Sequence, residues 1–139
     1  DGRQLAVRLL RLLHRLADRN EMNPTDFQCY TLLSVMGPST PGEIADSLCL
    51  STGTVTGVVD RLESRGIVER TRHPGDRRKV AVRLVEDATN TTPRRPGIRE
   101  AMTSLHEGYS EEELAVVVDW LERVGHTLED LINEADRTH

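Results

Sequence analysis

The side chains best suited to chemistry lie in residues 51–84, and they suit phosphate binding better than catalysis. This stretch carries eight Lys and Arg side chains against four acids, a net charge of +4. The whole chain has a net charge of −5, and residues 85–139 alone have −8. A basic island on an acidic protein is the electrostatic pattern expected of a surface that binds nucleic acid.

Within this stretch, hydroxyl groups and glycines share one face of a predicted helix that starts after Ser51 and stops at Gly66. The inward face is an apolar stripe at helical spacing, made of Val55, Val58, Val59 and Leu62. The outward face includes Gly53 and Gly57, each costing roughly 1 kcal/mol relative to alanine. That cost is understandable if the backbone must lie close to a major-groove wall. Hydroxyls near the N-terminus would suit phosphates and base edges; they belong to Ser51, Thr52, Thr54 and Thr56. The alternative is a small polar face left in water.

A basic hairpin follows this helix. Val80, Val82 and Leu84 alternate with polar or small residues, which predicts a half-buried strand. Its expected partner is residues 67–72, with a turn at residues 73–76. The tip reads Asp76-Arg77-Arg78-Lys79. An arginine on such a turn can enter a narrow minor groove, and Asp76 could orient a neighbouring guanidinium. An ordinary solvated turn is the alternative.

The remaining elements position this helix and hairpin. A helix over 3–19 has an apolar arc so wide that it lies either deep in a core or against another chain. Further helices are expected from Thr25 to Gly37, with Thr25 and Gln28 as a capping box, and from Thr40 to Leu48. Residues 86–97 are expected to be irregular, followed by helices at 98–106 and after Ser110, the last with a near-heptad apolar stripe. The fold class is therefore mainly α with a small two-stranded β-wing, a winged helix-turn-helix.

Several function classes are disfavoured. The five histidines have no metal-ligand spacing and no nucleophile or cofactor motif is present, so we expect no enzyme, cofactor or metal. Scarce aromatic residues argue against single-strand stacking, and no apolar run suits a membrane helix. Cys29 and Cys49 lack paired spacing, so a cytoplasmic protein is expected. We expect both thiols to be buried and unreactive in preference to a redox sensor.

The helices and hairpin together resemble a known family. GEIADSLCLSTGTVTGVVDRLESRGIVER followed by HPGDRRKVAVRLV is similar to the winged-helix core of the MarR family of bacterial transcriptional regulators. The resemblance implies a homodimer, with residues 1–20 and 98–139 as dimerisation helices, 25–85 as the DNA-binding domain and 86–97 as a connector. It implies a recognition helix in the major groove, with Arg61 added to the four hydroxyl residues. It also implies a minor-groove finger at Arg78 held by Asp76, with Arg77 on a phosphate.

The same resemblance suggests a pseudo-palindromic double-stranded DNA operator, a repressor, and a small aromatic effector. The expected effector pocket is formed by Leu13, Leu16, Phe27, Tyr30, Met102 and Leu105. Two departures stand out: LVEDATNTTPRRPG replaces the pattern usual after the wing, and neither cysteine lies in the first helix, where redox-sensing members carry theirs. A winged helix that binds protein instead of DNA is the rival, because fold alone does not fix function.

Overall fold

The computed structural model describes residues 1–86 and 97–138, in two compact units that divide after residue 95. The first unit holds α1 (Gly2–Arg19), α2 (Pro24–Met36), α3 (Pro41–Leu48), α4 (Thr52–Ser64), β1 (Val68–Arg72) and β2 (Val80–Leu84). The second holds α5 (Ile98–His106) and α6 (Glu111–Arg137). The expected mainly helical winged fold is confirmed. The predicted irregular stretch at 86–97 falls largely outside the described residues.

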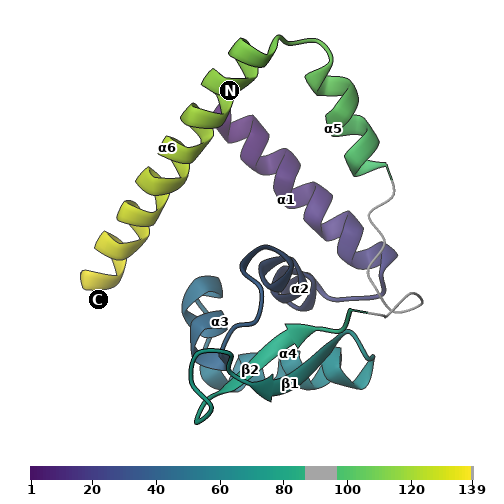
Figure 1. Cartoon of the computed structure of the whole chain (residues 1–139), viewed down its shortest axis with the longest axis vertical. Helices are drawn as coiled ribbons and strands as arrows, with labels where there is room; N and C mark the ends of the chain where they lie inside the picture. Colours follow the sequence, from purple (N-terminus) through teal and green to yellow (C-terminus); the bar gives the residue numbers. More distant parts are fainter. Residues whose placement is uncertain (87–96, 139) are drawn as a thin grey trace. The chain divides into compact units, whose positions relative to one another are not determined.

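The core of the first unit lies where α2, α3 and α4 pack together and against the two strands (Figure 1). The predicted inward stripe of α4 is buried throughout. Phe27 and Leu33 of α2 and Ile44 of α3, the two helices that pack on α4, are also almost fully buried. A short turn joins α3 to α4, so the helix-turn-helix is held by one shared apolar core.

Side-chain caps fix where these helices begin. The Thr40 hydroxyl accepts from the Glu43 backbone N–H (3.1 Å), and the Ser51 hydroxyl accepts from the Thr54 N–H (3.2 Å). Such caps satisfy amides that have no partner inside the helix. Gly66 follows α4 with φ +70°, a left-handed conformation that glycine adopts at little cost. The predicted boundaries of α3 and α4 are therefore confirmed.

The predicted start of α2 is wrong by two residues. Asn23 is the cap, its side chain accepting from the Asp26 N–H at 2.8 Å, and Pro24 occupies the first turn. Asn followed by Pro is itself a strong start signal, because proline lacks the N–H that would be left unpaired there. The capping box expected at Thr25 and Gln28 is not formed.

The wing is an antiparallel hairpin in which Val68 pairs with Leu84 and Arg72 with Val80. A short bridge adds to it, since Ser39 and Val82 exchange backbone hydrogen bonds of 2.8 and 3.0 Å. The predicted alternation along β2 holds only in part. Val82 is buried, but Val80 is 50 % exposed and Ala81 is fully buried. Helices α2 and α3 both pack on β2, so a small residue is accommodated on the face expected to be open.

Most side chains of α1, α5 and α6 are not buried in a hydrophobic core. Only Leu16 and Ala17 of α1 are buried, where its C-terminal end packs on α2, and its N-terminal part extends away from that core (Figure 1). In the second unit, neither α5 nor α6 has a buried residue among those described. The predicted capping box at Ser110 and Glu113 is confirmed. Over the described residues, no helix is long and apolar enough to span a bilayer.

Candidate nucleic-acid interface

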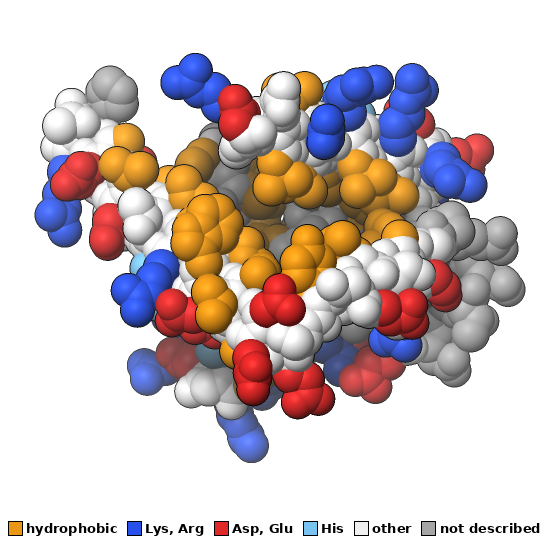
Figure 2. Space-filling model, turned by 90° about the horizontal axis from the view of Figure 1, so that it is seen from above, with side chains coloured by type: hydrophobic (Ala, Val, Ile, Leu, Met, Phe, Trp, Pro, Cys, Tyr) orange, Lys and Arg blue, Asp and Glu red, His pale blue; other side chains and the backbone are white. Residues whose placement is uncertain are grey.

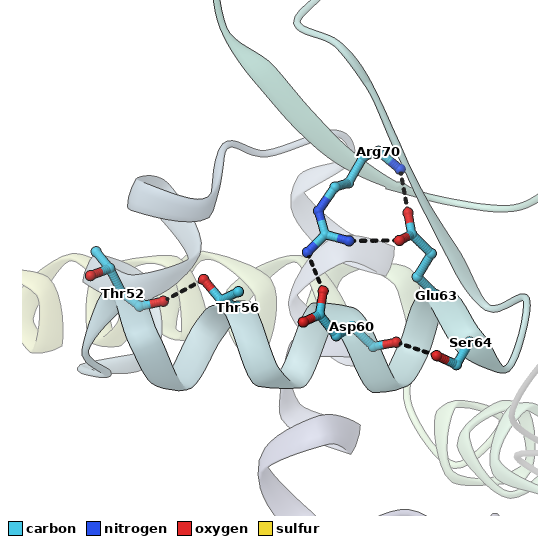
Figure 3. Close-up of polar contacts among 6 residues, drawn as sticks. All are labelled: Thr52, Thr56, Asp60, Glu63, Ser64 and Arg70. Atoms are coloured by element: carbon cyan, nitrogen blue, oxygen red, sulfur yellow. Dashed lines mark hydrogen bonds and ion pairs between the residues drawn. The ribbon is translucent and has the colours of Figure 1, made fainter.

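The hydroxyl residues at the start of α4 are all exposed, as predicted. Their hydroxyls are largely engaged within the helix. The Ser51 and Thr54 hydroxyls lie 2.9 Å apart, and Thr56 Oγ1 donates to the Thr52 carbonyl at 3.0 Å (Figure 3). Thr52 is the member of this group whose hydroxyl has no hydrogen-bond partner within the described part of the chain. The N-terminus of α4 therefore presents the Thr52 hydroxyl together with the N–H groups of its first turn that the Ser51 cap does not satisfy.

The two glycines of α4 differ in their surroundings. A Cβ at Gly53 would meet nothing within 4 Å, so nothing in the described protomer requires glycine there. A Cβ at Gly57 would lie 3.4 Å from Nη1 of Arg61, at the limit of ordinary contact. The helix-propensity cost of Gly53 consequently has no explanation inside the described chain.

Arg61 is not a free cation. Its Nε donates to Asp26 Oδ2 (2.9 Å) and its Nη2 to Oδ1 (2.8 Å), a bidentate ion pair between α4 and α2. The Asp26 side chain is only 7 % exposed, whereas that of Arg61 is 54 % exposed. These hydrogen bonds to Asp26 raise the pKa of Arg61 above its ordinary value. The role of Arg61 as a DNA contact stays a prediction, and two of its five N–H donors are engaged inside the protein.

Arg70 joins α4 to the wing. From β1 it donates to Asp60 and to Glu63 of α4, each at 2.6 Å, and its backbone N–H donates to Glu63 at 3.3 Å (Figure 3). Hydrogen bonds to Asp60, followed by the charge of Glu63, raise the pKa of Arg70. Because one guanidinium bridges two carboxylates of α4, β1 and α4 are fixed to each other.

The wing tip carries the cations that remain available. The side chain of Arg78 is 95 % exposed, while its backbone N–H donates to Asp76 Oδ1 at 3.0 Å and its Nε lies 3.6 Å from the same oxygen. Lys79 N–H donates to the Asp76 carbonyl (3.0 Å) and His73 N–H to the Lys79 carbonyl (2.8 Å). Asp76 therefore shapes the turn and leaves the Arg78 guanidinium projecting outward.

The basic island is divided between two uses. Three of its arginines pair with acids across elements: Arg61 with Asp26, Arg70 with Asp60 and Glu63, and Arg83 with Glu69. Arg65 donates to backbone carbonyls. The other four, which we call the wing cations, are Arg72, Arg77, Arg78 and Lys79; among the described residues only Arg78 has an ion pair. Within this basic island, the positive charge that is not engaged between elements is thus concentrated on the wing.

The predicted effector pocket stays a prediction, because Leu13, Leu16, Phe27 and Tyr30 belong to the first unit and Met102 and Leu105 to the second. Leu16, Phe27 and Tyr30 are buried, with the two rings 5.9 Å apart, so they act as core. Met102 and Leu105 belong to the second unit and are exposed. One open cavity of about 420 Å³ is lined by polar residues around Asp26 and Arg61, and another of about 430 Å³ lies along α1. Neither is lined by any of the six.

The two thiols differ in exposure. Cys29 is fully buried, and this burial, with a smaller effect of the Asp26 charge, raises the pKa of its thiol from 9.0 to about 11. Cys49 is exposed in the turn before α4, with a left-handed φ of +54°. The expectation of a buried thiol is therefore confirmed for Cys29 and wrong for Cys49.

The raised pKa of Cys29 predicts a loss of stability at high pH. Between pH 9 and 11 the unfolded thiol ionises while the folded thiol stays protonated, so the free energy of unfolding should fall, by on the order of 2 kcal/mol. Urea unfolding at pH 8 and pH 10.5 measures this, with Cys29→Ala as the control that lacks the group. An equal pH dependence in wild type and Cys29→Ala would contradict the assignment.

Asp26 and Arg70 were missed as site residues on the sequence, although Asp26 left a signal. Asp26, Tyr30 and Leu33 lie at i, i+4 and i+7, so an acid occupies the apolar stripe of α2. Such an acid indicates a buried ion pair, since an unpaired buried carboxylate is very costly. No comparable signal identifies Arg70, because its two partners lie on a different element.

Comparison with known proteins gives one consistent result. A model of the MarR family matches residues 22–80. An uncharacterized HTH-type transcriptional regulator of Bacillus subtilis, YcgE, is 33% identical over 92% of this chain and 84% of its own length. The HTH-type transcriptional regulator MhqR of the same organism is 31% identical over 77% of this chain and 74% of its own length.

Solved structures give the same fold. A MarR-like transcriptional regulator from Thermotoga maritima superposes with a TM-score of 0.63 at 29% identity, covering 93% of this chain and 97% of that one. A MarR family protein from Bacillus stearothermophilus gives 0.68 at 24% identity, over 91% and 89% of the two chains. The relatives of the present chain are transcriptional regulators and not enzymes, as its lack of a catalytic motif predicted. The chain therefore belongs to the MarR family of DNA-binding, HTH-type transcriptional regulators.

Proposed function

We propose that the protein is a homodimeric repressor that binds a pseudo-palindromic operator, with α4 in the major groove and the wing in the minor groove. The observation that carries the groove assignment is the wing tip. Four wing cations surround one turn, and Arg78 projects from it almost fully exposed. A narrow minor groove has an enhanced negative potential that attracts such a guanidinium. On α4, the open space at Gly53 supports close approach to a groove wall.

Homodimer formation is supported by apolar surface that the described chain leaves exposed. Figure 2 shows broad tracts of hydrophobic side chains at the surface, bordered by charged ones. On α1 the exposed set is Leu5, Val7, Leu9, Leu10 and Leu12; on α6 it is Val117, Val118, Trp120, Leu121, Leu128, Leu131 and Ile132, while Val116 is exposed on a different side of that helix from Leu121 and Leu128. Monomeric soluble proteins rarely expose this much contiguous apolar surface. We assign these faces of α1 and α6 to a second copy of the chain.

Charge supports the same assignment. Helix α1 carries five arginines against one acid, whereas the described part of the second unit has eleven acids against three arginines. Opposite charges at the margins of an interface favour one register and suppress wrong partners. An aromatic effector stays a prediction from family resemblance, because the residues expected to bind it are core or exposed surface. If none of a set of phenolic acids shifts the melting temperature of the protein, the prediction of an aromatic effector is wrong.

Replacing Arg78 by alanine tests the groove assignment. Operator affinity should fall by about 1–3 kcal/mol, with little change in the salt dependence of binding, if the guanidinium reads a groove. The operator is first obtained by selecting bound duplexes from a random pool, and affinity is then measured at several salt concentrations.

Arg77→Ala is the matched control, since it lies next to Arg78 and is also exposed. As a phosphate contact it should weaken all duplexes alike and reduce the salt slope by about 1. Unchanged affinity in Arg78→Ala would remove the wing from the interface. Failure of wild type to retain any duplex at low salt would instead favour the rival protein-binding module.

A further inference from the structure

Asp26 is a buried carboxylate in a domain that should carry positive charge toward DNA. Its side chain is 7 % exposed and both of its oxygens accept from Arg61, at 2.8 and 2.9 Å. The pair joins the first turn of α2 to the last turn of α4. A buried acid is kept only when a cation and hydrogen bonds compensate its lost hydration. Asp26 and Arg61 therefore fix one point of α4 relative to α2.

Arg65 provides a second fixed point one turn later. Its Nη1 donates to the Glu21 carbonyl at 3.1 Å and its Nη2 to the Asn20 carbonyl at 2.9 Å. These carbonyls lie in the corner between α1 and α2, where Glu21 has a left-handed φ of +54°. Arg61 and Arg65 are four residues apart and so share a face of α4. The C-terminal end of α4 is thus tied at two adjacent points, one to the first turn of α2 and one to the α1–α2 corner.

The first of these points adjoins the proposed DNA face. Nη1 of Arg61 does not bond to Asp26 and lies 3.4 Å from the position that a Cβ would take at Gly57. With Nε and Nη2 held by Asp26, the plane of the guanidinium is fixed in the bidentate geometry. The direction in which Nη1 can point is then determined by a residue that is itself buried away from DNA.

We propose that Asp26 is a positioning residue for DNA recognition: through Arg61, and together with Arg65, it fixes the orientation of α4 that selects the operator. This inference rests on the proposed docking of α4 in the major groove. It goes further by assigning specificity to a buried acid that touches no DNA. Arg61 then acts chiefly as the link between Asp26 and α4, with Nη1 as the nitrogen that makes no hydrogen bond to Asp26.

Asp26→Asn separates positioning from electrostatics. Electrostatics predicts tighter binding to every duplex, whereas positioning predicts weaker binding to the operator relative to an unrelated duplex. Removing one negative charge from the DNA-binding domain should strengthen binding to any duplex. Asparagine, however, presents an NH₂ group where Arg61 needs an acceptor, so the bidentate geometry is lost. Positioning therefore predicts that the ratio of operator to unrelated-duplex affinity falls, by about tenfold, even though the domain has become more positive.

The matched control is Asp46→Asn. Asp46 is an exposed residue of α3, and its side chain has no ion pair or hydrogen bond within the described chain, so the charge change is the same without the bidentate pair. Its affinity ratio should stay at the wild-type value. A second variant, Arg61→Lys, keeps the positive charge but cannot form the bidentate pair with Asp26. Its ratio of operator to unrelated-duplex affinity should fall, while the salt dependence of binding stays unchanged.

The ratio of operator to unrelated-duplex affinity is measured for each variant on the whole chain, and circular dichroism melting gives the folded fraction. Simple destabilisation lowers operator and unrelated-duplex binding in the same proportion and leaves the ratio unchanged. An unchanged ratio in Asp26→Asn and Arg61→Lys would overturn the positioning role while wild-type operator binding stands. Wild type that retains no duplex would instead overturn the docking of α4, so the two failures are distinguishable.

Discussion

Replacing Gly53 by leucine is expected to abolish operator binding while the domain becomes slightly more stable. Within the described protomer the new side chain meets open space, since even a Cβ has nothing within 4 Å. Leucine also favours a helix over glycine by roughly 1 kcal/mol. A bulky side chain on the face that enters the groove would hold α4 away from the bases. Affinity should then drop to the non-specific level, about 10³-fold or more below wild type.

Thermal unfolding and operator binding of the same preparations test this, with Gly53→Ala as an intermediate size. Stability should rise and affinity should fall in both variants, more steeply for leucine. Gly57→Leu is less informative, because a side chain there would press on Arg61. Full operator binding by Gly53→Leu would mean that this face of α4 does not enter a groove.

A charge on the apolar face of α6 is expected to give a monomer that no longer binds its operator. Leu121 and Leu128 are both more than half exposed in the described chain, so a double change to glutamate costs the isolated chain little. In a dimer interface the same carboxylates would be buried without partners, which is strongly unfavourable. Because a pseudo-palindromic operator offers two half-sites, a monomer would lose the gain from binding both together.

Sedimentation velocity gives the oligomeric state, and operator titration gives the affinity. Val116→Glu is the control: it introduces a glutamate into α6 at an exposed position away from the stripe that contains Leu121 and Leu128. That variant should remain dimeric. A Leu121→Glu, Leu128→Glu protein that is still a dimer would show that this face of α6 is not the interface.

The helix-turn-helix was predictable from sequence because its signals are local. Thr40 and Ser51 cap their helices, Gly66 ends α4, and the apolar stripe of α4 has one period throughout. Each of these features acts within a few residues, where propensity and capping rules apply. The start of α2 was missed because two start signals compete there, and Asn23 with Pro24 prevails.

The pairing of charges was not predictable because it depends on tertiary distance. Arg61 and Asp26 are 35 residues apart and Arg70 is ten residues from Asp60. In the sequence, Arg61, Arg70 and Arg78 contribute equally to the net charge of the basic island. Only the fold shows that the first two are engaged by acids and the third is exposed. The burial of Ala81 was not predictable for the same reason, because it depends on the packing of α2 and α3 on β2.

The Arg70 bridge has a consequence for the length of the operator. Since one guanidinium joins β1 to Asp60 and Glu63 of α4, the wing and α4 are held in one relative position. Inserting one base pair in B-form DNA displaces the following bases by about 3.4 Å and rotates them by about 35°. A rigid pair of contacting elements cannot follow that displacement. Each half-site would therefore be recognised by the distance between its major-groove and minor-groove segments as well as by its bases.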